Sequence, residues 1–174
     1  MKKILISTGL KFKKELDASN LIYLGEWCLL NYQEKNNNVI EYHWNDREKL
    51  FKDYIYLNQV YELFLSILAF KLNKYHSKSY PIDYWRILIG PWLLYFIHAT
   101  FDRWEMMNRA IVKYDVKNMI GFLNTNQDVF VPNDFKDFDL KSNSDSWNQF
   151  IFCFIGNFLN INQIRVLNLE KNSQ

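Results

Sequence analysis

The chain has 174 residues, of which 49% are hydrophobic and 23% are charged, and its formal net charge at pH 7 is +2. This composition excludes a disordered chain, and the length predicts a single domain, 1–174, with a core of ordinary size. The small net charge argues against nucleic acid as a partner, because the short basic run at Lys11, Lys13 and Lys14 is the largest present. The aromatic content of 18% indicates either a core rich in Phe and Tyr or a surface that stacks on flat ligands.

The first 43 residues predict short strands and loops. Residues 2–8 hold a continuous apolar run that suits a strand buried on both faces, as in a parallel α/β sheet. A second strand is predicted at 21–24, before Gly25. The Asn-rich segment 33–38 predicts a loop, and 39–43 a brief strand after it.

The middle of the chain changes to a helical period. The apolar residues that recur at three- and four-residue steps are Leu50, Tyr54, Leu57, Tyr61, Phe64, Leu68 and Leu72. Asn45 and Glu48 form a possible capping box at the start of this helix, which is expected to end within 73–79. Pro81 suits the first turn of a second helix, which is expected to continue past Pro91, with a kink there, to about Tyr114.

The remainder predicts a strand, a long loop, a helix and a closing strand. The strand is expected within 116–123, and the polar stretch 124–146 predicts a loop with at most one turn of structure. A third helix is expected from about Asp145, with an apolar face made of Trp147, Phe150, Ile151, Phe154, Ile155 and Phe158. Residues 164–169 predict a closing strand, so the whole chain reads as a helix-rich α/β fold.

The cysteines and the short apolar runs indicate the cellular compartment of the protein. Cys28 and Cys153 lack metal-ligand spacing and predict buried thiols in a reducing compartment. The apolar run at residues 4–6 is too short for a signal peptide. The apolar segment 87–101 is shorter than the roughly twenty residues that a spanning helix needs. We therefore expect a cytoplasmic protein, with at most peripheral contact at the inner face of the cell membrane.

The densest group of ionisable residues lies at the start of the first helix. His43 is a candidate general base, Asp46 a carboxylate that would orient it, and Arg47 a cation for an anionic substrate, beside Trp44. The alternative is structural, because acidic residues in a first helical turn complement the helix dipole.

A second group combines aromatic and charged residues around a Gly-Pro break, and its members are Trp85, Arg86, Trp92, Asp102 and Arg103. An arginine beside the break can bond carbonyls that a kink releases, or hold a phosphate or carboxylate with its planar fork. Asp102 and Arg103 can equally form salt bridges to other helices.

Several motifs are absent from the sequence. Ser7-Thr8-Gly9 contains one glycine and is no phosphate-binding loop, and neither zinc spacing nor a serine nucleophile elbow occurs. These absences argue against a P-loop enzyme, a metal hydrolase and a dinucleotide oxidoreductase. We accordingly expect neither a metal nor a cofactor.

Four motifs in order resemble a known family. They are Leu24-Gly25-Glu26-Trp27-Cys28, the segment 43–50 leading into Tyr54 and Leu57, the segment 84–93, and Asp102-Arg103. Together they resemble the N-terminal part of the transferases encoded in O-antigen and surface-polysaccharide gene clusters. Residues 105–174 carry no motif that matches, and the chain is much shorter than members of that family.

The resemblance implies a glycosyltransferase-like enzyme with a nucleotide-sugar donor as substrate and a sugar or glycolipid acceptor. It implies a Rossmann-like N-terminal half of a two-domain, GT-B-like plan, whose missing C-terminal domain or partner chain would hold most of the donor site. His43 and Asp46 would then be catalytic, with the arginines at 47, 86 and 103 holding anionic groups and the tryptophans at 44, 85 and 92 forming an aromatic wall. The alternative is a non-catalytic scaffold domain that binds a glycan or a partner enzyme.

Overall fold

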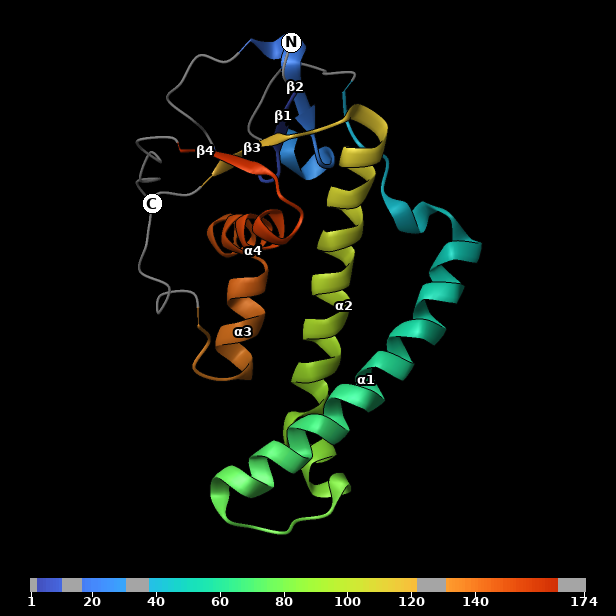
Figure 1. Ribbon diagram of the computed structural model, residues 1–174, viewed down its shortest axis with the longest axis vertical. Helices are drawn as coiled ribbons and strands as arrows, with labels where there is room; N and C mark the ends of the chain where they lie inside the picture. The colour runs from blue at the N-terminus through green and yellow to red at the C-terminus, as the bar shows by residue number, and fades with distance from the viewer. Residues whose placement is uncertain (1–2, 11–16, 31–37, 122–130, 166–174) are drawn as a thin grey trace. The chain divides into compact units, whose positions relative to one another are not determined.

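The computed structural model describes residues 3–10, 17–30, 38–121 and 131–165. The chain divides into two compact units (Figure 1). Unit 1 combines the segment up to Tyr42 with the segment from Arg103 onward, and unit 2 is His43–Asp102. The long helix α2 (Ile82–Tyr114) contributes its first part to unit 2 and its last part to unit 1.

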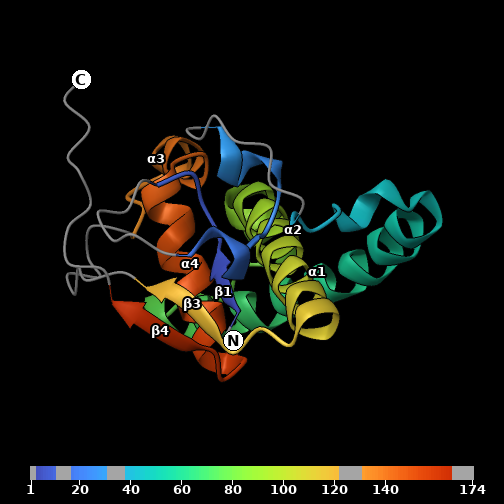
Figure 2. The ribbon, with the colours of Figure 1, turned by 90° about the horizontal axis from the view of Figure 1, so that it is seen from above.

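Unit 1 is built on a small parallel sheet. Its strands are β1 (Ile4–Ile6), β2 (Leu21–Tyr23), β3 (Asn118–Gly121) and β4 (Asn162–Arg165), in the spatial order β2-β1-β3-β4. Every pairing is parallel, with Leu5 opposite Ile22 on one side and Met119 on the other. Figure 2 shows β1, β3 and β4 side by side. The helix-rich α/β expectation is therefore confirmed, as are the strands predicted at 2–8, 21–24 and 116–123.

The last part of α2 and helix α4 (Asp145–Phe158) pack on one face of this sheet (Figure 1). Gly156 of α4 lies where these elements converge, because a Cβ there would fall 2.6 Å from Met119 Sδ and 3.6 Å from Met107 Cε. The shared core includes Met106, Ala110 and Phe152. Apolar side chains of two crossover helices thus cover the sheet, whose strands β1 and β2 are apolar throughout.

Helix α4 begins where the sequence predicted, but it buries a different face. Ser144 caps its N-terminus by accepting a hydrogen bond from the amide of Trp147. The buried residues are Trp147, Gln149, Phe152, Cys153, Ile155 and Gly156, whereas Phe154 and Phe158 are 56% and 73% exposed. The predicted apolar face was partly wrong because contact with β3 and α2 selects the small and polar residues Gly156, Cys153 and Gln149.

Residues within the predicted loop 124–146 form a two-turn helix, α3 (Phe135–Ser142). Asp134 caps it by accepting a hydrogen bond from the amide of Asp137, and Phe138 is buried with its ring edge against Trp147. The loop expectation was wrong here because one well-placed aromatic residue and a cap order an otherwise polar segment. Residues 124–130 of the predicted loop lie outside the described residues.

Unit 2 is a helical hairpin that follows a short turn, η3 (His43–Asn45). Helix α1 (Arg47–His76) packs against the first part of α2 through Leu65, Ala69, Trp85 and Leu93. The turn between the helices has Ser77 at φ 53°, and Asn73 closes it by hydrogen bonds to Tyr80 and to the Trp85 indole. The predicted helices and their junction at 73–79 are confirmed.

Two local predictions were wrong in unit 2 and just before it. The cap of α1 is Asp46, which accepts hydrogen bonds from the amides of Glu48 and Lys49, and not Asn45. The strand predicted at 39–43 is reduced to one bridge between Val39 and Tyr23. Helix α2 continues through Pro91; the kink there stays a prediction.

Two further segments fall largely outside the described residues. Of the predicted loop 33–38 the structure describes residue 38 alone. The predicted closing strand 164–169 overlaps β4 at 164–165, and 166–169 lie outside the described residues.

Candidate functional site

The carboxyl edge of the sheet holds a buried polar cluster. Ser7 and Thr8 directly follow β1, and each is 1% exposed. Gln149 of α4, also 1% exposed, accepts hydrogen bonds from Ser7 Oγ at 3.1 Å and Thr8 Oγ1 at 2.8 Å. Its Nε2 donates to the carbonyl of Ile120 in β3 at 2.7 Å. One side chain therefore joins the ends of β1 and β3.

The position of this cluster follows from the strand order. The chain adds β2 on one side of β1 and β3 on the other, so the order of strands reverses at β1. In open parallel sheets the loops after such neighbouring strands separate and leave a ligand-binding crevice at their carboxyl ends. Gln149 lies at the base of this edge, and its four contacts (the two hydroxyls, the carbonyl, and Cys153 Sγ at 3.5 Å) occupy its amide. We infer that it holds the two strand ends in a defined geometry.

The segment after β2 approaches the same edge. It forms the turn η2 (Glu26–Leu29), and the Trp27 indole Nε1 donates to the carbonyl of Ser7 at 3.1 Å. A Cβ on Gly25 would overlap the six-membered ring of Trp27, so this ring position requires glycine at 25. The Gly-Glu-Trp motif of the sequence thus has a local physical basis. Trp27 is half-buried and Glu26 is exposed.

Cys28 completes this turn as a structural residue. Its Sγ is buried and donates to the carbonyl of Ile6 at 3.4 Å. Burial raises the pKa of the Cys28 thiol to about 12. The thiol is therefore protonated at neutral pH and is a poor nucleophile. The two cysteines are free and buried, as the sequence predicted.

The sequence-predicted base His43 lies in unit 2, fully buried. Its Nε2 lies 3.0 Å from Asp102 Oδ1, and its Nδ1 lies 3.9 Å from Asp53 Oδ2. Asp53 also accepts hydrogen bonds from the Trp44 indole at 2.9 Å and from Lys49 Nζ at 2.7 Å. This environment favours a role in joining η3, α1 and α2, and proton transfer by His43 stays a prediction.

Asp46 does not orient His43. Its carboxylate caps α1, and Asp102 of α2 takes the place beside the imidazole that the sequence reasoning assigned to Asp46. Arg47, the first residue of α1, is exposed. The structure therefore brings together His43, Trp44 and Asp102 from the two predicted groups.

The other predicted residues of unit 2 have structural partners. Arg86 binds Glu62 through both guanidinium nitrogens, at 2.6 and 2.9 Å. This contact raises the pKa of Arg86 and lowers the pKa of Glu62. Trp85 is 4% exposed with its indole bonded to Asn73, and Trp92 is half-buried with its ring stacked on Phe96. Arg86 thus pairs with Glu62 rather than with carbonyls at the Gly-Pro break, and substrate binding by Trp85, Arg86 and Trp92 stays a prediction.

Arg103 belongs to unit 1, whereas Arg86 belongs to unit 2. Its Nε donates to Asn148 Oδ1 at 2.8 Å, a terminal nitrogen donates to the carbonyl of Ser142 at 3.3 Å, and its guanidinium lies 5.7 Å from the Trp147 ring centroid. Arg103 thereby ties α2 to the junction between α3 and α4. Asp102 and Arg103 are adjacent in sequence, but their side chains serve different units.

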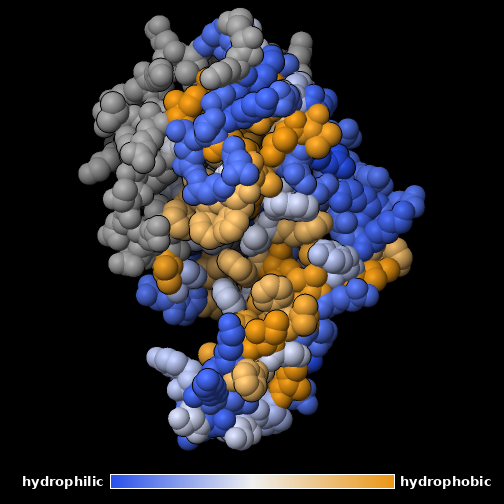
Figure 3. Space-filling view, viewed as in Figure 1, coloured by the Kyte–Doolittle hydropathy of each residue, from blue (hydrophilic) through white to orange (hydrophobic). Residues whose placement is uncertain are grey.

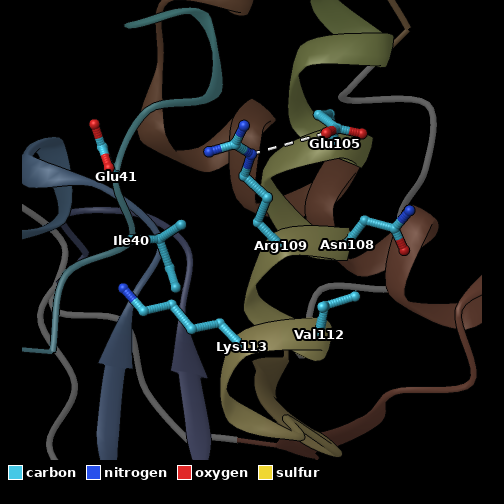
Figure 4. Close-up of a pocket in the computed structure, with 7 residues that line it drawn as sticks. All are labelled: Ile40, Glu41, Glu105, Asn108, Arg109, Val112 and Lys113. Atoms are coloured by element: carbon cyan, nitrogen blue, oxygen red, sulfur yellow. Dashed lines mark ion pairs between the residues drawn. The ribbon is translucent and has the colours of Figure 1, made fainter. Parts of the chain in front are cut away.

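A separate open pocket of about 370 Å³ lies beside the last part of α2 (Figure 4). It is lined by Ile40, Glu41, Glu105, Asn108, Arg109, Val112 and Lys113. Its lining contains two cations, Arg109 and Lys113, and two carboxylates, Glu41 and Glu105, and Arg109 lies 3.8 Å from Glu105. This balance of charge indicates no preference for an anionic or a cationic ligand. Within the described ranges, no group of three metal-binding side chains occurs.

Only weak signals in the sequence point to the sheet edge. Ser7 and Thr8 follow the first strand directly, which is the usual place for ligand-binding residues in an α/β sheet. Gln149 is the one buried amide in α4, and nothing local distinguishes it from a solvent-facing glutamine. Only the contact between α4 and the ends of β1 and β3 identifies it.

The comparison with protein families gives one match, and it covers nearly the whole chain. A family model described as LIC12162 family transferase matches residues 3–174. Neither the curated proteins nor the solved structures contain a match.

Proposed function

Because the chain belongs to the LIC12162 family of transferases, we propose that the carboxyl edge of its sheet binds a sugar-bearing substrate of a group transfer. The proposed enzyme is glycosyltransferase-like and acts in the synthesis of a bacterial surface polysaccharide. In this proposal unit 1 is the acceptor side of a longer, two-domain enzyme. The nucleotide-sugar donor is a substrate that another domain or chain holds.

One observation carries the proposal: Gln149 binds Ser7, Thr8 and the carbonyl of Ile120 at the point where the strand order reverses. Three polar side chains, those of Ser7, Thr8 and Gln149, are buried there at 1% exposure. Such a cluster restricts the positions of the carboxyl ends of β1 and β3. A defined strand-end geometry is what a substrate site needs.

Trp27 supports a sugar as the substrate class. The indole of Trp27 is fixed by its hydrogen bond to Ser7 and by the absence of a side chain at Gly25. A fixed, half-buried aromatic ring can pack against the apolar face of a pyranose, and the exposed carboxylate of Glu26 can accept hydrogen bonds from sugar hydroxyls.

The proposed reaction transfers a glycosyl group. The bond between the anomeric carbon and the nucleotide phosphate breaks, a bond from that carbon to an acceptor hydroxyl oxygen forms, and the hydroxyl proton passes to a base. The proposal assigns acceptor binding to unit 1 and no proton transfer to its residues.

The test is ligand-observed NMR on the 174-residue protein with a panel of monosaccharides, short oligosaccharides and nucleotide sugars. We expect binding of at least one carbohydrate, and Trp27→Ala is expected to weaken it about tenfold because the stacking surface is lost. The matched control is Trp104→Ala, which removes another partly exposed tryptophan of unit 1.

Two results would contradict the proposal. One is a folded protein that binds none of the panel, and the other is binding that Trp27→Ala leaves unchanged. Carbohydrate binding by the complete enzyme without turnover of any nucleotide sugar would instead favour the glycan-binding scaffold that the sequence left as its alternative.

A further inference from the structure

The α1–α2 hairpin exposes many large apolar side chains on the faces of its helices that do not form its core. On α1, Leu63 is 59% exposed, Phe64 47%, Ile67 42% and Phe70 73%. Figure 3 shows hydrophobic side chains gathered over this hairpin and hydrophilic ones at its turn. On most soluble proteins the exposed apolar residues are scattered singly. A contiguous apolar surface therefore indicates a site that contacts a membrane or a partner.

The exposed residues of α1 form one face. Leu63, Phe64, Ile67 and Phe70 recur at three- and four-residue spacing, so they lie on the same side of the helix. Leu65 and Ala69, which are buried against α2, lie on the opposite side. Helix α1 therefore has two apolar faces, and its contact with α2 uses one of them. A helix that is apolar all round is typical of a core or of a lipid environment.

Helix α2 repeats this arrangement within unit 2. Tyr84, Ile87, Leu88 and Leu94 are 42%, 82%, 60% and 37% exposed, and their spacing again places them on one side of the helix. Trp85 and Leu93, which face α1, are buried. Each helix of the hairpin thus has an outer apolar face in addition to the face that holds the hairpin together.

The turn of the hairpin carries positive charge. Lys71, Lys74 and Lys78 are exposed, and residues 63–82 contain no Asp or Glu. Lys71 and Lys74 continue the outer face of α1, four and seven residues after Ile67. Tyr75 beside them is 83% exposed. Lysines and aromatic rings next to apolar residues are typical of a surface that contacts anionic lipid headgroups.

A bilayer fits this surface better than a protein does. Protein interfaces are depleted in lysine, whereas the end of the hairpin, residues 63–82, combines three lysines with aliphatic and aromatic side chains. Among the described helices, α1 is the one whose length and composition would allow it to cross a membrane. The ion pair between Glu62 and Arg86 lies midway along the hairpin, and a charged pair is costly in the hydrocarbon region. Contact along the surface avoids this cost.

We propose that the α1–α2 hairpin docks on the surface of an anionic lipid bilayer. The outer apolar side chains of α1 and α2 enter the boundary between headgroups and acyl chains, and the three lysines of the turn bind lipid phosphates. This inference does not depend on the proposed function, because it rests on residues of unit 2 and the substrate site lies in unit 1.

The experiment is vesicle flotation with the 174-residue protein. The probes are vesicles of phosphatidylcholine mixed with phosphatidylglycerol, and vesicles of phosphatidylcholine alone. We expect the protein to float with the anionic vesicles and to bind the neutral ones more weakly. The variant K71Q/K74Q/K78Q is expected to lose binding to anionic vesicles about a hundredfold, because each lysine near an anionic surface contributes roughly a factor of five.

A second variant tests the apolar contribution. Ile67→Ser, Phe70→Ser and Ile87→Ser together are expected to weaken binding to both kinds of vesicle by at least about a hundredfold. These side chains are exposed, so the fold is expected to survive, and circular dichroism checks this. The control is Val112→Ser with Phe158→Ser, which removes two highly exposed apolar side chains from unit 1 and is expected to bind like the unmodified protein.

Three outcomes would overturn the proposal. In the first, the folded protein stays unbound in the presence of anionic vesicles. In the second, the unit 1 control loses as much binding as the hairpin variants. In the third, light scattering shows a dimer that the Ile67, Phe70 and Ile87 substitutions dissociate while vesicle binding is absent, which would assign the surface to a second copy of the chain.

Discussion

The replacement Gln149→Leu tests the central contact of the candidate site. Leucine keeps most of the volume and removes every hydrogen bond of the amide, so the hydroxyls of Ser7 and Thr8 and the carbonyl of Ile120 lose a partner. A buried polar group without a partner costs about 1–3 kcal/mol. Because a hydroxyl can rotate, we count the carbonyl and one hydroxyl, so the expected loss in the free energy of unfolding is about 2–6 kcal/mol. Urea unfolding followed by circular dichroism measures this loss.

A combined variant separates hydrogen bonding from packing. Adding Ser7→Ala and Thr8→Val to Gln149→Leu removes both hydroxyls, so we expect it to recover about 1–3 kcal/mol, because no hydroxyl then lacks a partner while the carbonyl of Ile120 still does. Gln163→Leu is the control, since Gln163 also donates hydrogen bonds but is only half-buried, and its loss is expected to be about 1 kcal/mol or less. The reasoning fails if Gln149→Leu costs less than about 1 kcal/mol, or if the three substitutions prove additive.

Three further predictions concern single residues. Gly25→Ala is expected to displace the Trp27 ring and to cost about 1–3 kcal/mol, seen as a lower melting temperature and altered tryptophan fluorescence; an unchanged spectrum would contradict it. Burial lowers the pKa of His98, so the folded state favours its neutral form. The contribution of His98 to the free energy of unfolding is therefore expected to be complete above the ordinary pKa of 6.5 and to be lost as the pH falls through the lowered pKa. Over this pH range the urea midpoint of His98→Gln should fall less than that of the unmodified protein. Because burial raises the pKa of Cys28 to about 12, a thiol reagent at pH 8 is expected to label it only after unfolding, and rapid labelling of the native protein would refute this assignment.

The fold could be predicted where local pattern decides it. The apolar run at β1 and the helical spacing of α1 and α2 identified these elements and their order. The cap of α1 was misplaced by one residue, because Asn45 and Asp46 are both good caps and only the backbone geometry distinguishes them. Helix α3 was missed because its one buried aromatic residue, Phe138, gains its stabilisation from Trp147 of another helix.

The site was harder to predict because its residues are far apart in sequence. The sequence suggested the nearby Asp46 as the carboxylate beside His43, but the imidazole pairs with Asp102, 59 residues away. Arg86 and Arg103 were grouped, yet each has a partner in a different unit. Proximity in sequence is a poor guide to side-chain partners once helices of this length turn back on one another.

The sequence by itself determined the class of fold, the positions of the main helices and, through its ordered motifs, a resemblance to a transferase family. Short-range forces are sufficient for this, because periodic burial and turn chemistry act over a few residues. Only the tertiary structure decided that Gln149 meets Ser7 and Thr8, 142 and 141 residues away, and that α1 keeps a second apolar face outward. Such contacts depend on which surfaces of the elements pack together, and every apolar face competes for that packing, so local pattern does not specify the outcome.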